Sequence, residues 1–357
     1  MKQDYIVIGA GIIGLATAER LLAQGAAVTV LERGKTGAES SWAGGGILSP
    51  LCPWDYPDEV TRLTRYSADL FSAWAADLHA ATDIDPEYET SGMLVLPPFD
   101  LQLAQQWCAT HAVTLCQAKA ADYASGISGD ALYLPEVAQV RNPRLLRALH
   151  RRVIMLGGCI IEQCAVTGLI NEQGQVQALD TSCGPFSAHK YIVAAGAWSR
   201  EVLGKHALQL DIKPVRGQML LYKFTAPPLA HIVLQNDLYL IPRRDGYVLI
   251  GSTLEDVGFD KQTTVAARDD LLQRAQKILP QLRDLPLLQH WAGLRPGSPH
   301  NIPTIARHPQ LNNLYINSGH FRYGVTMAPA SVEILLNEIT GQPQPIDVAP
   351  YRAGWGS

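Results

Sequence analysis

Apolar positions near the start of the chain form two short runs with a helical stretch between them. Residues 4–8 read Asp-Tyr-Ile-Val-Ile, and residues 27–31 read Ala-Val-Thr-Val-Leu. Both runs are typical of buried strands, whereas residues 15–24 have the spacing of a helix. This order of strand, helix and strand predicts a unit with two parallel strands.

Three glycines and one acid occupy the special positions of this unit. Gly9, Gly11 and Gly14 follow the first strand in the spacing GxGxxG, and Glu32 ends the second strand. Gly9 permits a tight turn, Gly11 lets the backbone approach a pyrophosphate, and Gly14 allows the helix to pack closely on the strand. The start of the helix favours phosphate, and Glu32 can accept hydrogen bonds from a ribose. We therefore predict a dinucleotide site. The motif alone does not separate FAD from NAD, and a structural turn without a ligand is the alternative.

After this unit the sequence pattern first predicts both helices and strands, then extended segments, and finally a strand and a helix again. Helical spacing is expected at residues 57–80, 144–155 and 329–340. Apolar runs predict strands at residues 159–161, 166–170, 191–195 and 314–317. From about residue 213 the segments alternate, which predicts antiparallel strands at residues 219–224, 238–242 and 247–250. Asp245-Gly246 signals a hairpin turn between the last two, and Gly341 signals the end of the last helix.

This order predicts an α/β fold in which a nucleotide domain is split along the chain and an antiparallel-sheet domain covers it. We assign the nucleotide domain to residues 1–84, 140–212 and 297–357. We assign the sheet domain, which would carry the substrate site, to residues 85–139 and 213–296.

Composition narrows the functional classes. The 357 residues are 47% hydrophobic and carry a net charge of −4, without a basic run, so nucleic acid is not an expected partner. No apolar run approaches the length of a membrane span, and we expect no cleaved leader. The six cysteines are irregularly spaced and the ten histidines form no metal-binding pattern. These features favour a cytoplasmic location, and no metal is expected.

Four further blocks give the chain a family resemblance. Residues 40–48 read Ser-Ser-Trp-Ala-Gly-Gly-Gly-Ile-Leu, residues 195–198 read Ala-Gly-Ala-Trp, residues 291–297 read Trp-Ala-Gly-Leu-Arg-Pro-Gly, and residues 319–322 read Gly-His-Phe-Arg. Together with the glycine motif, these blocks resemble the D-amino acid oxidase family of flavoproteins, and most closely its glycine oxidase branch, which is associated with thiamine thiazole synthesis. The resemblance implies an FAD-binding Rossmann-like domain of glutathione-reductase type and an antiparallel-sheet substrate domain.

The resemblance also implies a set of FAD contacts. Ser40 and Ser41 would donate hydroxyl groups to phosphate, and the triple glycine would lie against the flavin, unless it is a flexible surface loop. The loop before the last helix would bring backbone N–H groups to the flavin's pyrimidine end. FAD is expected to be non-covalent, because Gly293 stands near the position where a sarcosine-oxidase branch has its attachment cysteine. The implied cofactor residues are Gly9, Gly11, Ile12, Ile13, Gly14, Glu32, Arg33, Ser40, Ser41, Gly45, Gly46, Ile47, Val166, Gly196, Trp198, His320, Phe321, Arg322, Tyr323, Gly324, Val325 and Thr326.

On the substrate side, the resemblance points to Arg295, Tyr239 and Arg322. A planar guanidinium binds a carboxylate through two parallel hydrogen bonds, which is the role implied for Arg295. Tyr239 would add its hydroxyl group. The alternatives are structural ion pairs for the two arginines and ordinary packing for the tyrosine.

The implied activity is oxidative deamination of glycine and similar small amines such as sarcosine and small D-amino acids. A hydride would pass from the substrate Cα to flavin N5, and O₂ would be reduced to H₂O₂. A dehydrogenase using a quinone or protein acceptor, a non-catalytic flavin-binding protein and an NAD-linked dehydrogenase are the alternatives. A thiazole synthase and further copies of the chain are the candidate partners.

Four residues depart from the family pattern, and the sequence leaves their effect on the pocket open. They are Asp237, Tyr323, Thr326 and Met327.

Overall fold

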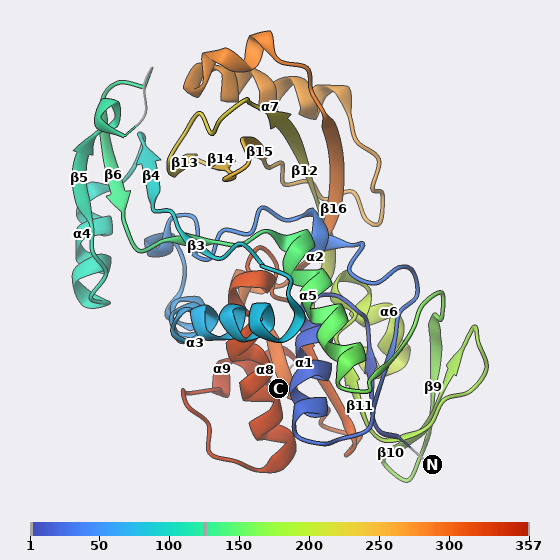
Figure 1. Ribbon diagram of the computed structural model, residues 1–357. Coiled ribbons are helices and arrows are strands. Elements are labelled where there is room, and N and C mark those ends of the chain that lie inside the picture. The colour runs from blue at the N-terminus through green and yellow to red at the C-terminus, as the bar shows by residue number, and fades with distance from the viewer. Residues whose placement is uncertain (1–2, 124–126, 356–357) are drawn as a thin grey trace.

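The computed structural model describes residues 3–123 and 127–355 and contains two large sheets (Figure 1). One sheet has six strands in the order β17-β18-β11-β1-β2-β8. The other has eight strands in the order β16-β12-β15-β14-β13-β4-β6-β5. The predicted α/β fold class is therefore confirmed.

The six-stranded sheet is parallel except at one edge. Its strands are β1 (Gln3–Ile8), β2 (Val28–Leu31), β8 (Cys159–Ile161), β11 (Ala188–Val193), β17 (Thr304–Arg307) and β18 (Leu314–Ser318). Strand β1 pairs in parallel with both β2 and β11, and only β17 runs antiparallel to its neighbour. The connection from β1 to β2 is α1 (Ile12–Ala23), which begins three residues before the predicted helix. The predicted strand–helix–strand unit is confirmed.

Different layers cover the two faces of this sheet. One face packs against the helices α1, α5 (Asn142–Met155) and α8 (Gly324–Thr340), and α3 (Asp58–Thr82) packs in turn on α5 and α8. The other face packs against α6 (Ser199–Leu203) and the hairpin formed by β9 (Val166–Glu172) and β10 (Gln175–Thr181). The sheet is apolar on both faces, which explains why its strands appear in the sequence as continuous apolar runs.

The eight-stranded sheet is antiparallel except for one pair. Its strands are β4 (Met93–Leu96), β5 (Cys116–Lys119), β6 (Asp130–Leu134), β12 (Lys213–Lys223), β13 (Ile232–Gln235), β14 (Leu238–Pro242), β15 (Tyr247–Gly251) and β16 (Gln289–Gly297). The exception is β4, which runs parallel to β13. The predicted hairpin between β14 and β15 is present, with Gly246 at φ +81° in its turn.

Two helices cover opposite faces of this second sheet. α7 (Val265–Ile278) packs its Leu271, Ala275 and Ile278 against the outer face, at the end of the molecule opposite α8 (Figure 1). α4 (Leu101–Thr110) packs on the other face, in the same apolar cluster as Tyr239. The pattern analysis did not predict either helix. Short elements complete the chain, namely α2 (Ser40–Ala43), β3 (Glu89–Thr90), β7 (Ala138–Gln139) and α9 (Ala349–Arg352).

The start of α8 differs from the prediction. We placed it at Pro329, because proline favours the first turn of a helix. The helix instead begins at Gly324, and the N–H of Met327 already donates to the carbonyl of Tyr323 at 2.8 Å. Gly341 ends the helix with φ +70°, as predicted.

Strands of the six-stranded sheet come from three separated parts of the chain, with the second sheet between them in sequence. The exact domain boundaries stay a prediction. None of the described helices combines the length and the apolar character needed to cross a membrane.

Candidate functional site

A continuous cavity extends from the ends of β1 and β2 to the inner face of the eight-stranded sheet. Two of the predicted site residues, Gly14 and Thr326, do not line it. All the others do, from Glu32 and Val166 at one end to Tyr239 and Arg295 at the other. The fold therefore brings together residues separated by nearly the whole sequence. What each residue contributes follows from its local geometry.

The glycine turn after β1 is tightly packed. Gly9 has φ +105°, a conformation that glycine adopts without strain, and its N–H donates to the carbonyl of Leu31 at 2.8 Å. A Cβ atom on Gly14 would overlap the carbonyl oxygen of Gly9. Gly14 therefore acts by allowing α1 to start against the turn, without facing the cavity itself. A Cβ atom on Gly11 would lie 3.0 Å from the hydroxyl oxygen of Ser41, its only close contact, on the side that faces the cavity.

The start of α1 offers backbone N–H groups to this end of the cavity. The hydroxyl oxygen of Ser41 accepts from the N–H of Ile12 at 2.9 Å. Its own proton remains available for a ligand oxygen. First-turn N–H groups have no acceptor within their helix, and the helix dipole adds positive character there. This cradle fits the pyrophosphate of a dinucleotide.

Glu32 is held in place by backbone groups. One carboxylate oxygen accepts from the N–H of Ala10 and the other from the N–H of Gly34, both at 2.8 Å. A carboxylate has about four acceptor sites, so ribose hydroxyl groups can use those that remain. The fixed orientation fits the role expected for this acid.

Arg33 and Trp198 form one wall beside Glu32. The guanidinium of Arg33 lies 3.5 Å from the centre of the Trp198 ring and donates to Glu39 at 2.9 Å. Trp198 also stacks on Phe259 of the loop after β15, with ring centres 5.4 Å apart.

The triple-glycine segment is anchored, which excludes the alternative of a flexible surface loop. Asn142 donates to the carbonyl of Gly44 at 3.0 Å, and Arg243 donates to the carbonyl of Gly45 at 2.7 Å. Gly46 has φ +76°, and a Cβ atom there would overlap the carbonyl oxygen of Val140. The backbone therefore lies in the cavity wall with no side chain in front of it.

Thr326 supports this segment from α8. Its hydroxyl donates to the carbonyl of Ile47 at 3.0 Å, and its side chain is buried away from the cavity. Thr326 therefore contacts the cavity wall through the backbone of Ile47, and its role as a cofactor residue stays a prediction.

The loop before α8 forms the wall next to the substrate end. His320 shares a hydrogen bond of 2.9 Å with the hydroxyl of Ser331, and burial lowers the pKa of His320 to about 3. His320 is therefore neutral at ordinary pH. Phe321 has φ +46° and donates its N–H to Pro296 at 3.0 Å. The start of α8 follows at the cavity, where its dipole favours negative charge on a ligand.

Arg295 is the cation at the far end of the cavity. It donates to the carbonyl of Thr253 at 3.1 Å and to the hydroxyl of Ser252 at 2.6 Å. Burial lowers the pKa of Arg295, although guanidinium groups keep their proton in proteins. Within residues 3–123 and 127–355, no carboxylate forms an ion pair with Arg295 or Arg322. The structural ion pairs considered as alternatives are therefore absent from the described residues.

Tyr239 and Tyr323 lie near these arginines. The hydroxyl of Tyr239 is 3.8 Å from the sulfur of Met219, and the bare Cα of Gly251 makes room for the ring. Tyr323 packs edge-on against Tyr56, with ring centres 5.2 Å apart. Burial raises the pKa of Tyr323 well above its usual value, so its hydroxyl stays protonated.

Of the four residues that depart from the family pattern, only Tyr323 lines the cavity. Asp237 is exposed at the turn before β14 and pairs with Arg274. Met327 is fully buried among the helices. The side chains of Asp237 and Met327 therefore do not form the cavity wall.

Several polar or small residues in the cavity wall were not predicted from the sequence. Among them are Asn142, Gly217 and Asn317. A Cβ atom on Gly217 would overlap the guanidinium of Arg295, so this glycine leaves the space that the arginine fills. Glycine inside a strand often marks such a close approach, and this signal was present in the sequence.

Comparisons with known proteins agree with this geometry. The family described as FAD dependent oxidoreductase matches residues 4–337. A glycine oxidase of Pseudomonas aeruginosa is 43% identical over 98% of this chain and 98% of its own length. The bifunctional protein ThiO/ThiG of Trichormus variabilis is 32% identical over 96% of this chain, and the match covers 53% of that protein.

A solved structure supports the same assignment. The crystal structure of glycine oxidase from Geobacillus kaustophilus superimposes with a TM-score of 0.92 and is 25% identical, covering 98% of this chain and 97% of that one. The predicted cofactor, FAD, is confirmed, and the NAD-linked alternative is not supported. The chain belongs to the family of FAD-dependent oxidoreductases that its motifs predicted, the D-amino acid oxidase family.

Proposed function

We propose that this chain oxidatively deaminates glycine and similar small amines, with FAD held non-covalently and O₂ as the acceptor. When bound, FAD would supply the redox chemistry, as the acceptor of the substrate hydride and the donor of electrons to O₂. The relatives named glycine oxidase support this reaction, since they match the chain over almost its full length.

The proposal depends above all on Arg295, which has no carboxylate partner among the described residues. Its guanidinium reaches the cavity with only neutral protein acceptors in the described structure. A planar cation in this state is suited to the carboxylate of an amino acid. A flavin-binding protein without turnover would need no such group, which weakens the non-catalytic alternative.

The surroundings of Arg295 also favour the reactive form of the substrate. An amine can release a hydride from its Cα only when its nitrogen is neutral. Arg295 and Arg322 both line this end, whereas the cavity-lining acids Glu32, Glu39 and Glu201 belong to the other end. Nearby positive charge lowers the pKa of an amine, so this end favours the neutral amine without a dedicated base.

The size of the substrate end favours a small amine. Leu51, Met219, Tyr239 and Tyr323 line it, and Tyr323 is held by Tyr56 and by the N–H of Leu51 at 3.5 Å. A rigid aromatic wall leaves little room for a long side chain on the substrate Cα.

A peroxide assay tests the proposed function. Purified holoprotein is incubated in air with glycine, sarcosine, N-ethylglycine and D-alanine, and flavin absorbance is followed without oxygen in parallel. We expect peroxide with glycine or sarcosine and anaerobic bleaching by the same amines. Bleaching without peroxide would instead identify a dehydrogenase with another acceptor, and neither signal with any of the four amines would contradict the proposal.

We also propose that the product imine is passed to a thiazole synthase. The support is the bifunctional protein ThiO/ThiG, whose sequence extends well beyond the part that this chain matches. For this chain, a separate thiazole synthase would take the place of the part of ThiO/ThiG that the chain does not match. A homo-oligomeric state stays a prediction.

A further inference from the structure

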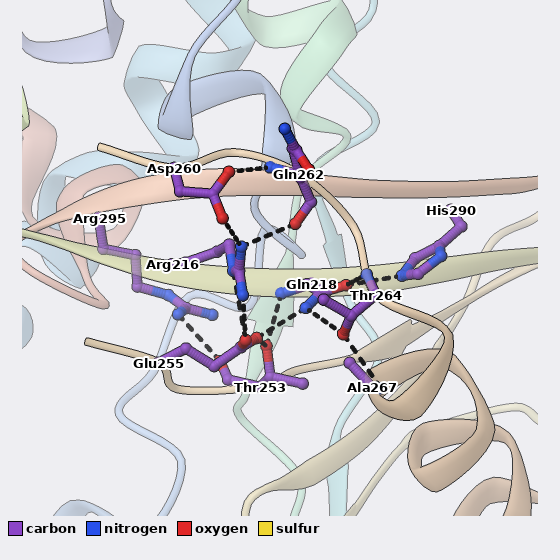
Figure 2. A network of polar contacts seen from close by, with 10 residues as sticks. All are labelled: Arg216, Gln218, Thr253, Glu255, Asp260, Gln262, Thr264, Ala267, His290 and Arg295. Carbon is purple, nitrogen blue, oxygen red and sulfur yellow. Dashed lines mark hydrogen bonds and ion pairs between the residues drawn. The ribbon is translucent and has the colours of Figure 1, made fainter. Parts of the chain in front are cut away.

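A polar network formed by Arg216, Gln218, Thr253 and Glu255 lies next to Arg295 (Figure 2). Side chains alternate along a strand. Gly217 therefore lies beneath the guanidinium of Arg295, while its neighbours Arg216 and Gln218 point into the network. Neither neighbour lines the cavity.

Arg216 and Glu255 form the centre of this network. Nε and Nη2 of Arg216 both donate to one carboxylate oxygen of Glu255, at 3.2 and 2.6 Å. Nη1 donates to Asp260 at 2.7 Å and to the carbonyl of Gln262 at 2.8 Å. The side chain of Arg216 is only 5% exposed, so these bonds form in a largely desolvated place. Charge-assisted bonds of this kind are strong and directional.

The second oxygen of Glu255 holds Thr253. It accepts from the hydroxyl of Thr253 and from Nε2 of Gln218, the latter at 2.8 Å. The Thr253 hydroxyl oxygen also accepts from the backbone N–H of Gln218 at 2.9 Å. The side chain of Thr253 is thereby fixed from two directions.

The same short segment supports the guanidinium of Arg295 on the cavity side. The carbonyl of Thr253 and the hydroxyl of Ser252 are the acceptors of its two terminal nitrogens. We infer that Glu255, held by Arg216, is a positioning residue, which fixes Thr253 and through it the carboxylate-binding orientation of Arg295. This inference rests on the proposed function, because it assigns a role in binding the substrate carboxylate.

Within the network, the negative charge of Glu255 is balanced by Arg216. Burial alone would raise the pKa of Glu255, but hydrogen bonds and the charge of Arg216 together hold it below the usual range. Glu255 is therefore ionised, and the charge is balanced by Arg216. Arg295 remains without a carboxylate partner in the described structure, so its charge is available to the substrate.

A pair of substitutions at Thr253 tests this inference in the holoprotein. Thr253→Val keeps the size of the side chain and removes the hydroxyl, whereas Thr253→Ser keeps the hydroxyl. Binding of acetate, a minimal carboxylate, is measured from the change in flavin absorbance, and KM and kcat for glycine are measured separately. We expect Thr253→Val to raise the acetate Kd and the glycine KM roughly tenfold, the effect of one lost hydrogen bond, with a smaller change in kcat. Thr253→Ser should stay within about twofold of the wild type.

Two further variants test the inference without a substitution at Thr253, in case the Thr253 variants fail to fold. Glu255→Gln keeps an acceptor for the Thr253 hydroxyl and loses the pairing with Arg216, so we expect an increase in acetate Kd between those of the two Thr253 variants. Gly217→Ala would push the guanidinium from the other side and should also raise the Kd. Flavin content and melting temperature are compared first, so that each variant tested is folded and loaded.

The outcomes separate the two proposals. If Thr253→Val binds acetate as well as the wild type does, the positioning role is wrong. If acetate leaves the wild-type spectrum unchanged, carboxylate binding at Arg295 and its positioning both fail. If acetate binds and the variants weaken it, but glycine is not oxidised, the positioning role stands and only the proposed substrate fails.

Discussion

Arg243 and Arg295 have no carboxylate partner among the described residues, yet their surroundings give them different roles. Arg243 is buried and donates to Gln139 and to the carbonyl of Gly45, both at 2.7 Å. Burial lowers the pKa of Arg243 to about 10. Arg295 has neutral acceptors behind it and the cavity in front of it. The first arginine therefore supports the backbone, and the second can bind a ligand.

At this scale we predict that Arg295→Ala raises the KM for glycine by roughly tens- to hundreds-fold, because two charge-assisted hydrogen bonds are lost. Arg295→Lys should fall between this variant and the wild type, since a lysine keeps the charge but not the two parallel bonds. Steady-state kinetics measures both, and flavin absorbance should show that FAD stays bound. An unchanged KM in the alanine variant would remove Arg295 from the substrate site.

At the scale of elements, the turn between β1 and α1 gives its glycines separate tasks. Gly14 faces the carbonyl of Gly9, whereas Gly11 lines the cavity beside the hydroxyl of Ser41. Gly11 also has φ −78° and ψ −174°, an extended conformation that other residues adopt. Gly14 is therefore required for the fold, whereas Gly11 is required so that the pyrophosphate can approach the turn.

We predict that Gly11→Val folds but fails to retain FAD, because its side chain would occupy the space of the pyrophosphate. Gly14→Ala should instead lower the melting temperature of the apoprotein by roughly 3–10 °C, as expected for an overlap costing about 1–3 kcal/mol. Flavin content and thermal unfolding of the apoproteins separate the two effects. A fully yellow Gly11→Val protein would show that the pyrophosphate does not approach at this glycine.

At the scale of the whole molecule, the cavity lies between two sheets that must keep their relative position. Arg243 follows β14 in the second sheet and binds the glycine segment that follows α2. Asn142 at the start of α5, which packs on the six-stranded sheet, donates to the same segment. These contacts join the two sheets through the wall of the cofactor site.

We predict that Arg243→Met destabilises the protein by about 1–3 kcal/mol for each buried acceptor left without a donor. Its exposed neighbour Arg244 is the matched control, because its side chain is 51% exposed and pairs with Glu89 at 3.1 Å. Arg244→Met should change stability by less than about 1 kcal/mol. Denaturant unfolding with and without FAD measures both, and equal effects would show that Arg243 does not support the site.

The local parts of this protein were predictable because their signals lie close together in sequence. The unit from β1 to β2 depends on three glycines and two apolar runs within 32 residues, and each has its own physical requirement. The hairpin at Gly246 and the end of α8 at Gly341 depend on single glycines with positive φ. In contrast, α4 and α7 were missed, although α7 has Thr264 as its cap, because their apolar faces are narrow.

The sequence by itself determined the family, the cofactor and many of the residues that line the cavity, because these depend on short motifs with fixed chemistry. Only the tertiary structure decided how these residues act. It showed that Thr326 supports a carbonyl, that Gly217 leaves space for Arg295, and that Arg216 and Glu255 lie behind the site. Such roles depend on pairing between β12, β15 and β16. Those strands pair across long sequence distances, and no local pattern in the chain encodes which side chains they bring into contact.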